Sequence, residues 1–315
     1  MGSGSGSGSG SRRARARLLA AVAAGVVAAL VATGAVLLPT LQRDRASAPA
    51  RDASGVTIVD AIAYGADPTQ RIDLCLPRGE AGVDRAAILL VHGGSWARGS
   101  RTEPHWRDTC AWLARAGYVV ANVDYRLAPA DPFPAAIEDV TAALTWLRSP
   151  ETLATYAIDP GRIGAFGGSA GGNLVSLLGT AGTGAWDAGA RVAAVVTMSA
   201  PLDLTGANVR DDFVERQLAY LGCDDLDDCP AAPLASPATF ADATDPPFLV
   251  VHGDDEMIPL EQAEAFVAAL EDVGAPVRLA VVPSERHSIG LLDEPDVRDE
   301  ILAFLAATLE EPALG

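Results

Sequence analysis

The chain has 315 residues, among them 23 arginines and no lysine, and its formal net charge is −18. Without lysine it cannot form a Schiff base, a P-loop lysine site or a Ser-Lys dyad. Seven arginines and one aspartate give residues 1–51 a charge of about +6, which leaves about −24 for residues 52–315. Residues 52–315 are acidic enough to repel phosphate groups, which argues against nucleic acid as a partner.

The N-terminal segment has the pattern of an export signal or a membrane anchor. Residues 2–11 are a Gly/Ser repeat, and four arginines follow before an uncharged, apolar run over residues 18–42. Leu18 to Leu38 is long enough to span a bilayer, whereas Ala46-Ser47-Ala48 offers a small-x-small cleavage site. An uncleaved anchor is slightly favoured over a cleaved signal, and a buried core helix is a third interpretation.

These features divide the chain into four parts. Residues 1–17 form a Gly/Ser linker with a basic n-region, 18–42 the signal anchor or signal peptide, 43–54 a linker, and 55–315 one large domain. Either favoured interpretation of the apolar segment places that domain outside the cytoplasm, anchored in the membrane or secreted. The oligomeric state leaves no signature in the sequence.

The four cysteines agree with an exported protein. Cys223 and Cys229 flank a short acidic loop, which a disulfide would close in an oxidising compartment. Cys75 and Cys110 form either a second bridge or two buried thiols. No Cys/His spacing resembles a metal site, and no cofactor is implied.

Strand-like and helix-like segments alternate along the domain. The expected strands are Val56–Val59, Arg71–Leu76, Ala87–Val91, Tyr118–Val123, Ile163–Phe166, Val192–Met198, Phe248–Val251 and Val277–Val282. The expected helices are Pro104–Ala116, Ala135–Arg148, Ala170–Leu178, Leu260–Asp272 and Val297–Leu309. This alternation predicts an α/β fold with a mostly parallel, eight-stranded sheet and helices on both faces.

The segment Asp203 to Pro247 interrupts this alternation. It is long, acidic and rich in proline. We expect it to be a small, cap-like excursion over the C-terminal edge of the sheet, where it would roof a substrate pocket.

Ser169 lies in the pattern Gly167-x-Ser169-x-Gly171, between an expected strand and an expected helix. Strand, sharp turn and helix are the context of a nucleophile elbow, in which small neighbours relieve the crowding around a strained serine. The alternative is a glycine-rich turn in which Ser169 merely caps the helix.

A nucleophilic serine needs a base, an acid that orients the base, and donors for the oxyanion. Of the four histidines, His287 follows the last expected strand, where a base can reach over the sheet edge. His92 begins a His-Gly-Gly segment suited to oxyanion binding by backbone N–H groups, and His105 and His252 are expected to be structural.

The acid follows less clearly from the sequence. Asp254 and Asp255 both come after the expected strand that ends near Gly253. A carboxylate in this position could hold His287 in the required tautomer. Asp255 is preferred, with Asp254 and then Asp203 as alternatives, which gives the order Ser169, Asp255, His287.

Together these motifs resemble α/β-hydrolases of the hormone-sensitive-lipase-like esterase group. The matching segments are His92-Gly93-Gly94, Asp124-Tyr125-Arg126-Leu127-Ala128-Pro129, Phe133–Asp139, Gly167–Asn173 and Asp255-Glu256-Met257-Ile258-Pro259. The resemblance covers roughly residues 56–309 and implies an α/β-hydrolase fold. Ser95 stands where the group has a third glycine, and Ser95-Trp96 is similar to feruloyl-esterase-like and arylformamidase-like branches. The stretch between His252 and Asp255 is one residue shorter than the group's pattern.

The sequence therefore predicts a serine carboxylic-ester hydrolase that forms an acyl-enzyme from a small-molecule ester. Ser169, Asp255 and His287 would be catalytic, with Gly93, Gly94 and Ala170 forming the oxyanion hole. The alternatives are an amide, peptide or formamide hydrolase with the same triad, and a non-catalytic binding module of the same fold.

Overall fold

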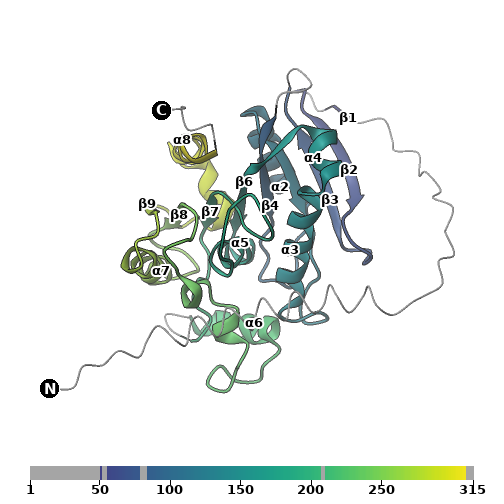
Figure 1. The fold of residues 1–315 in the computed structure, drawn as a ribbon. Helices are drawn as coiled ribbons and strands as arrows, with labels where there is room; N and C mark the ends of the chain where they lie inside the picture. Colours follow the sequence, from purple (N-terminus) through teal and green to yellow (C-terminus); the bar gives the residue numbers. More distant parts are fainter. Residues whose placement is uncertain (1–49, 52–54, 79–83, 207–209, 310–315) are drawn as a thin grey trace, which may run out of the picture.

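The computed structural model describes residues 50–51, 55–78, 84–206 and 210–309 (Figure 1). The predicted linker, basic region and apolar segment before residue 50 therefore lie outside the described residues. Within the described part of the chain, no helix combines the length and apolar character needed to cross a membrane.

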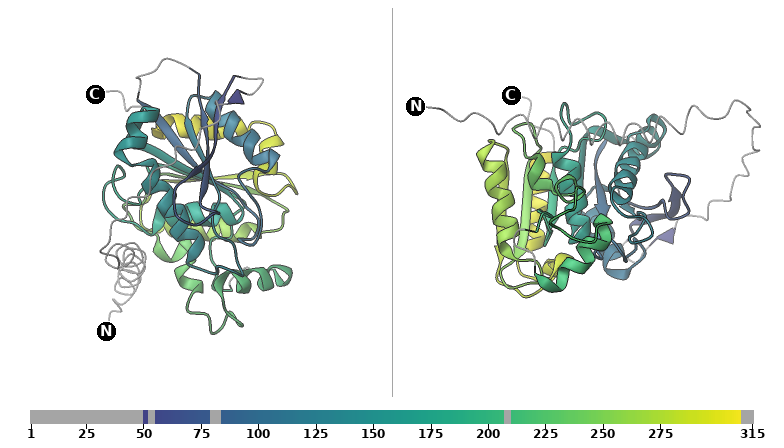
Figure 2. Two further views of the ribbon diagram at one scale, coloured as in Figure 1. Left: turned by 90° about the vertical axis from the view of Figure 1, so that its right-hand side faces the viewer. Right: turned by 90° about the horizontal axis from the view of Figure 1, so that it is seen from below.

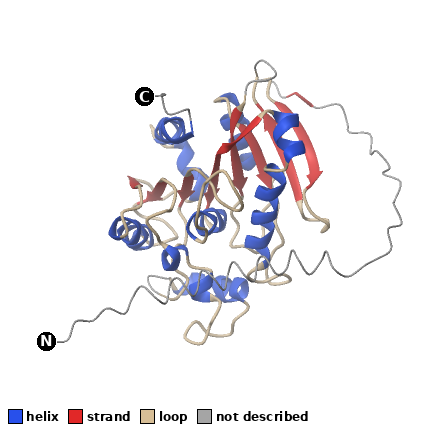
Figure 3. Ribbon diagram, viewed as in Figure 1, coloured by secondary structure: helices blue, strands red, loops and turns tan. Residues whose placement is uncertain are grey.

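A single twisted sheet forms the centre of the domain (Figure 3). Its strands are β1 (Ala50–Arg51), β2 (Thr57–Ala63), β3 (Arg71–Leu76), β4 (Arg85–Val91), β5 (Val119–Val123), β6 (Ile158–Gly168), β7 (Val195–Met198), β8 (Phe248–Gly253) and β9 (Val277–Val282). They are arranged in the order β1-β2-β3-β5-β4-β6-β7-β8-β9. The pairings from β1 to β5 along this order are antiparallel and the others are parallel. The eight predicted strands are present as β2 to β9, and β1 adds a two-residue edge.

Helices cover both faces of the sheet (Figure 2). They are α2 (Pro104–Arg115), α3 (Ala135–Leu147), α4 (Pro150–Tyr156), α5 (Ala170–Thr180), α6 (Asp211–Leu221), α7 (Leu260–Asp272) and α8 (Val297–Leu309), with short 3-10 turns η1 (Ala232–Leu234), η2 (Pro237–Phe240) and η3 (Ser288–Asp293). Buried side chains of α3, α5 and α7 pack on one face, and those of α2 and α8 pack on the other. The central strands are buried on both faces, as parallel strands in a three-layer domain must be.

The excursion Asp203–Pro247 contains α6 and the turns η1 and η2. Rings from α6 pack against Trp96: the Tyr220 ring is stacked at 4.2 Å between centroids and the Phe213 ring lies at 6.1 Å. The excursion therefore covers the apolar side of the loop after β4. None of its described residues lines the large cavity beside Ser169, so the expected roof over that cavity is wrong.

Two disulfides connect the outer parts of the domain. Cys223 and Cys229 close the acidic loop of the excursion, as the sequence predicts. Cys75 on β3 is bonded to Cys110 on α2, which decides between the two interpretations of that pair. The second bridge ties α2, a helix that lines the cavity, to the antiparallel half of the sheet.

Candidate active site

Ser169 occupies the sharp turn between β6 and α5. Its backbone angles, φ 55° and ψ −124°, lie outside the regions that L-residues prefer. Glycine is required beside it: a Cβ on Gly171 would lie 2.1 Å from the Val91 carbonyl oxygen, and one on Gly167 would lie 2.3 Å from the Gly171 carbonyl oxygen. The Ser169 hydroxyl makes no capping hydrogen bond to α5. The turn therefore has the geometry of a nucleophile elbow, with a hydroxyl left available.

The His92-Gly93-Gly94 segment passes close to this serine. A Cβ on Gly93 would lie 3.2 Å from the Ser169 Cβ and 2.8 Å from the Gly168 carbonyl oxygen, so only glycine permits the approach. Among the described residues, the backbone N–H groups of Gly93, Gly94 and Ala170 have no hydrogen-bond acceptor. Ala170 is also the first residue of α5, where the helix dipole favours negative charge.

A buried ion-pair cluster fixes the far end of the loop that carries these glycines. Arg101 Nε donates to Asp73 at 2.8 Å, and its Nη1 donates to Asp124. The Arg101 backbone N–H also donates to Asp124 Oδ1 at 2.6 Å. Asp73 is buried and is also paired with Arg107 at 3.2 Å, so two arginines compensate its charge. The cluster thus joins β3, the loop and the segment after β5.

His92 is held inside this loop. Its ring stacks on Tyr125 with 4.3 Å between centroids, and its Nδ1 lies 2.8 Å from the Gly93 carbonyl oxygen. Burial lowers the pKa of His92, against the opposing effects of that carbonyl and of Asp124. A neutral, buried imidazole suits a structural role in shaping the loop that carries Gly93 and Gly94.

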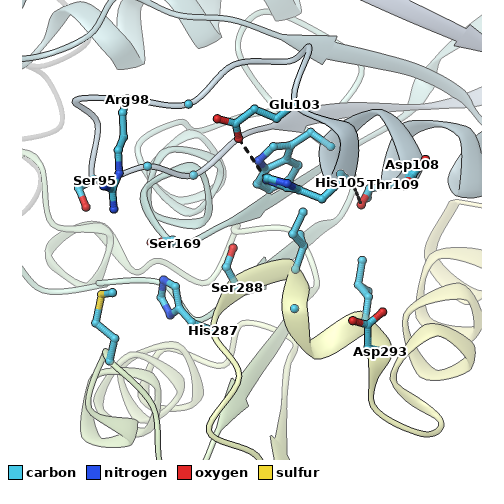
Figure 4. Close-up of a pocket in the computed structure, with 18 of the residues that line it drawn as sticks. Ser95, Arg98, Glu103, His105, Asp108, Thr109, Ser169, His287, Ser288 and Asp293 are labelled. Atoms are coloured by element: carbon cyan, nitrogen blue, oxygen red, sulfur yellow. Dashed lines mark hydrogen bonds and ion pairs between the residues drawn. The ribbon is translucent and has the colours of Figure 1, made fainter.

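His287 lies in the loop after β9, on the opposite side of Ser169 from the glycine loop (Figure 4). Its Nδ1 contacts Oε2 of Glu256, whose side chain is fully buried. No hydrogen bond joins the side chains of Ser169 and His287, although both line the same cavity. Such contacts often tighten only when a substrate is bound.

The carboxylate that faces His287 is therefore Glu256, not the predicted Asp255. Asp255 is exposed, and Asp254 accepts the backbone N–H of Ser284 at 2.9 Å. Asp203 turns back onto its own loop, where it accepts the N–H of Thr205 at 2.8 Å. None of the three expected carboxylates contacts His287.

Two opposing effects act on the pKa of Glu256. Burial by itself would raise that pKa, but the close contacts with the rings of His252 and His287 outweigh burial and hold it below the usual value of 4.5. Glu256 is consequently ionised near neutral pH, as a carboxylate must be if it is to stabilise a protonated histidine.

The sequence contained one departure that bears on this carboxylate. The stretch between His252 and Asp255 is one residue shorter than the hormone-sensitive-lipase-like pattern, which leaves open which of the acidic residues after Gly253 faces His287.

Ser169 and His287 open into a cavity of about 590 Å³. Figure 4 shows Ser169 between Arg98 and Ser95 on one side and His287 on the other. Further along, the cavity is lined by side chains of α2 and of the segment after His287. His105, which the sequence predicted to be structural, also lines the cavity. Its Nε2 lies 3.2 Å from the Glu103 carboxylate.

Comparison with known proteins agrees with this geometry. Residues 72–270 match the BD-FAE family. Esterase LipC from Mycobacterium tuberculosis is 32% identical over 254 residues, which are 74% of this chain and 60% of that relative. The chain thus spans less than two thirds of that relative's length.

Two solved structures share the fold. A truncated carbohydrate esterase from gut microbiota has a TM-score of 0.71 at 24% identity, over 81% of this chain and 97% of that one. A thermophilic esterase from the Planctomycetes species Thermogutta terrifontis has a TM-score of 0.61 at 25% identity, over 78% of this chain and 89% of that one. With its elbow serine, glycine loop and α/β-hydrolase sheet, the chain belongs to the BD-FAE family.

Proposed function

We propose that this protein is a serine carboxylic-ester hydrolase that works through an acyl-enzyme. The observation that carries the proposal is that Ser169, on a strained elbow, shares one cavity with His287, whose Nδ1 contacts the buried carboxylate of Glu256. Nucleophile, base and orienting acid come from three different loops at the same sheet edge, an arrangement that serves little purpose besides catalysis.

In the first half of the reaction, Ser169 Oγ attacks the ester carbonyl carbon and His287 Nε2 takes the hydroxyl proton. Glu256 stabilises the resulting imidazolium through Nδ1. The N–H groups of Gly93, Gly94 and Ala170 are placed to donate to the oxyanion. When the tetrahedral intermediate collapses, the C–O bond to the alcohol breaks and His287 gives its proton to the leaving alcohol.

In the second half, water replaces the alcohol. His287 removes a proton from the water as it attacks the acyl-enzyme, and returns that proton to Ser169 Oγ as the acid leaves. All proton transfers in this cycle use His287, so no metal or cofactor enters the proposed mechanism.

The cavity favours a hydrophilic alcohol over a long lipid. Five charged side chains line it beside apolar ones such as Trp106 and Leu292; the charged residues are Arg98, Glu103, Asp108, Asp293 and Arg298. Burying an alkyl chain against them would desolvate these charges without compensation, whereas hydroxyl groups can form hydrogen bonds with them. We therefore infer esters of a polar alcohol with a short acyl group.

The test is hydrolysis of p-nitrophenyl esters from acetate to palmitate by the wild type and by Ser169→Ala, together with labelling by a fluorophosphonate. Serine-dependent activity that declines with acyl length supports the proposal in full. Activity that rises toward palmitate refutes the short-acyl inference. Labelling of Ser169 without ester hydrolysis indicates an amide or formamide hydrolase, and absence of labelling indicates a binding module.

We also propose that the domain works outside the cytoplasm, either anchored by residues 18–42 or released. Two disulfides within the described residues support this location, because such bonds persist in oxidising compartments. Intact-mass measurement of the protein from membrane and medium fractions distinguishes an uncleaved anchor from cleavage after residue 48. Recovery of the full-length chain with free thiols from the cytosol would contradict the proposal.

A further inference from the structure

A second histidine lies behind the carboxylate that backs His287. His252 is near the end of β8, and its side chain is 1% exposed. Its Nδ1 lies 2.5 Å from Glu256 Oε1, within ion-pair distance although the angle is not that of a hydrogen bond, and its Nε2 lies 3.3 Å from the Pro259 carbonyl oxygen. One imidazole ring thus touches both the middle and the end of the loop that connects β8 to α7.

The Glu256 carboxylate is divided between two rings. Oε1 faces His252 Nδ1, whereas Oε2 faces His287 Nδ1. The two oxygens are parts of one rigid plane, so any rotation that releases Oε1 also moves Oε2. The Glu256 side chain is fully buried, which keeps bulk water from replacing a lost donor.

No other charged group competes for this carboxylate among the described residues. Asp254, on the same loop, is turned toward the backbone of Ser284. Arg286, next to His287, is paired with Asp293 at 2.8 Å and with Glu294 at 3.1 Å. The orientation of the Glu256 carboxylate therefore depends on the two histidines.

We propose that His252 is a positioning residue for the reaction: the close contact of its Nδ1 with Oε1 of Glu256 restrains the carboxylate and thereby keeps Oε2 on His287. This inference rests on the proposed esterase function, because it gives His252 a part in the same catalytic machinery. His252 itself does not touch the cavity, so its effect must pass through Glu256.

Three substitutions separate the two contacts of the ring. His252→Leu removes both ring nitrogens. In His252→Asn the side-chain amide nitrogen lies near the position of Nδ1, so it can still donate to Glu256. In His252→Gln the amide nitrogen lies near the position of Nε2 and can reach only the Pro259 carbonyl oxygen. Val251→Ala is the matched control, because Val251 is also buried on β8 but packs on the opposite face of the sheet.

We expect His252→Leu to lower kcat for a short ester by about 10- to 100-fold, the usual effect of losing a hydrogen bond to a charged group, with KM changed by less than about twofold. His252→Asn should recover most of this loss and His252→Gln little of it. Val251→Ala should keep kcat within about twofold of the wild type.

The pH profile supplies a readout that a purely structural role would not change. Burial raises the pKa of Glu256, and the contact with His252 opposes this effect. Without His252, the pKa of Glu256 should therefore rise. Glu256 then takes up a proton at higher pH, and a neutral acid cannot stabilise protonated His287. The acidic limb of kcat/KM should therefore move to higher pH in His252→Leu and return toward the wild type in His252→Asn.

The outcomes distinguish this inference from the function on which it rests. If the wild type lacks Ser169-dependent ester hydrolysis, the proposed function fails. If the wild type is active but His252→Leu matches Val251→Ala in kcat and in pH profile, the positioning role is refuted. It is also refuted if Gln restores activity and Asn does not, because His252 would then act only by clamping the loop at Pro259.

Discussion

Glu256 and His287 are 31 residues apart in the sequence, yet their side chains are in direct contact through Oε2 and Nδ1. The first follows β8 and the second follows β9, and these neighbouring parallel strands end at the same edge of the sheet. Gly253 makes this possible: a Cβ there would lie 2.6 Å from the Ser284 carbonyl oxygen in the loop that leads to His287. The two loops can therefore pack closely enough for Glu256 to reach His287, because no side chain at Gly253 separates them.

The first prediction concerns the identity of the triad acid. Glu256→Gln keeps the size of the side chain but removes the charge that stabilises protonated His287, so kcat should fall on the order of 10²-fold or more. Asp255→Asn removes an equal charge one residue earlier, at an exposed position, and should change kcat by less than about twofold. Steady-state kinetics on one short p-nitrophenyl ester measure both. The reverse ranking would return the role to Asp255.

These two residues also show how far the sequence determines the site. The placement of Ser169 and His287 beside one cavity follows from their neighbours: glycines crowd the elbow, and β9 ends shortly before His287. The carboxylate that contacts His287 is not predictable in the same way, since adjacent residues of a loop point in different directions. The backbone pattern places the loop, but packing against His252 and His287 selects Glu256.

A similar limit applies to the fold. Helix α7 and strand β9 begin and end at the predicted residues, because a proline precedes the helix and a glycine, alanine and proline separate it from the strand. Helix α6 was not predicted. It lies within the long acidic excursion, and its partner is Trp96, more than one hundred residues away in the sequence, so the sequence does not show what its apolar face packs against.

The second prediction concerns stability and pH. The pKa of Glu256 is depressed in the folded protein, so its charge stabilises the fold at pH values above about 4.5, the usual pKa. That contribution is lost as the pH falls through the lower, folded pKa. The free energy of unfolding should thus be higher for the wild type than for Glu256→Gln near neutral pH, and the difference should shrink on acidification. Urea titrations at a series of pH values measure this, and a difference that grows toward low pH would contradict it.

The third prediction tests the elbow. In Gly171→Ala the new Cβ would meet the carbonyl oxygens of Val91 and His92, at 2.1 and 2.5 Å, and these backbone atoms cannot move without displacing the end of β4. We expect a loss of about 2 kcal/mol or more in the free energy of unfolding. Gly290→Ala is the control, since the nearest atom to its Cβ would be 3.7 Å away. Equal stability of the two variants would mean that the elbow has more room than its geometry indicates.

The last prediction concerns the link between the excursion and the glycine loop. Ser95 and Trp96 have φ values of 52° and 54°, a left-handed conformation that costs free energy unless packing holds it. The stacked ring of Tyr220 supplies that packing from α6. Tyr220→Ala should therefore lower the free energy of unfolding by about 3 kcal/mol or more and should also reduce kcat by about tenfold, because the neighbouring oxyanion donors lose their fixed position.

Tyr220→Phe separates packing from hydrogen bonding in this contact. The Tyr220 hydroxyl is buried and has no hydrogen-bond partner among the described residues, so its removal should leave stability unchanged or slightly higher while the stack persists. Urea unfolding and kcat for a short ester, measured on the same preparations, test both variants. If Tyr220→Ala loses stability but keeps the kcat of the wild type, the excursion stabilises the domain without positioning the loop. If Tyr220→Phe loses as much as Tyr220→Ala, the hydroxyl and not the stacked ring carries the contact.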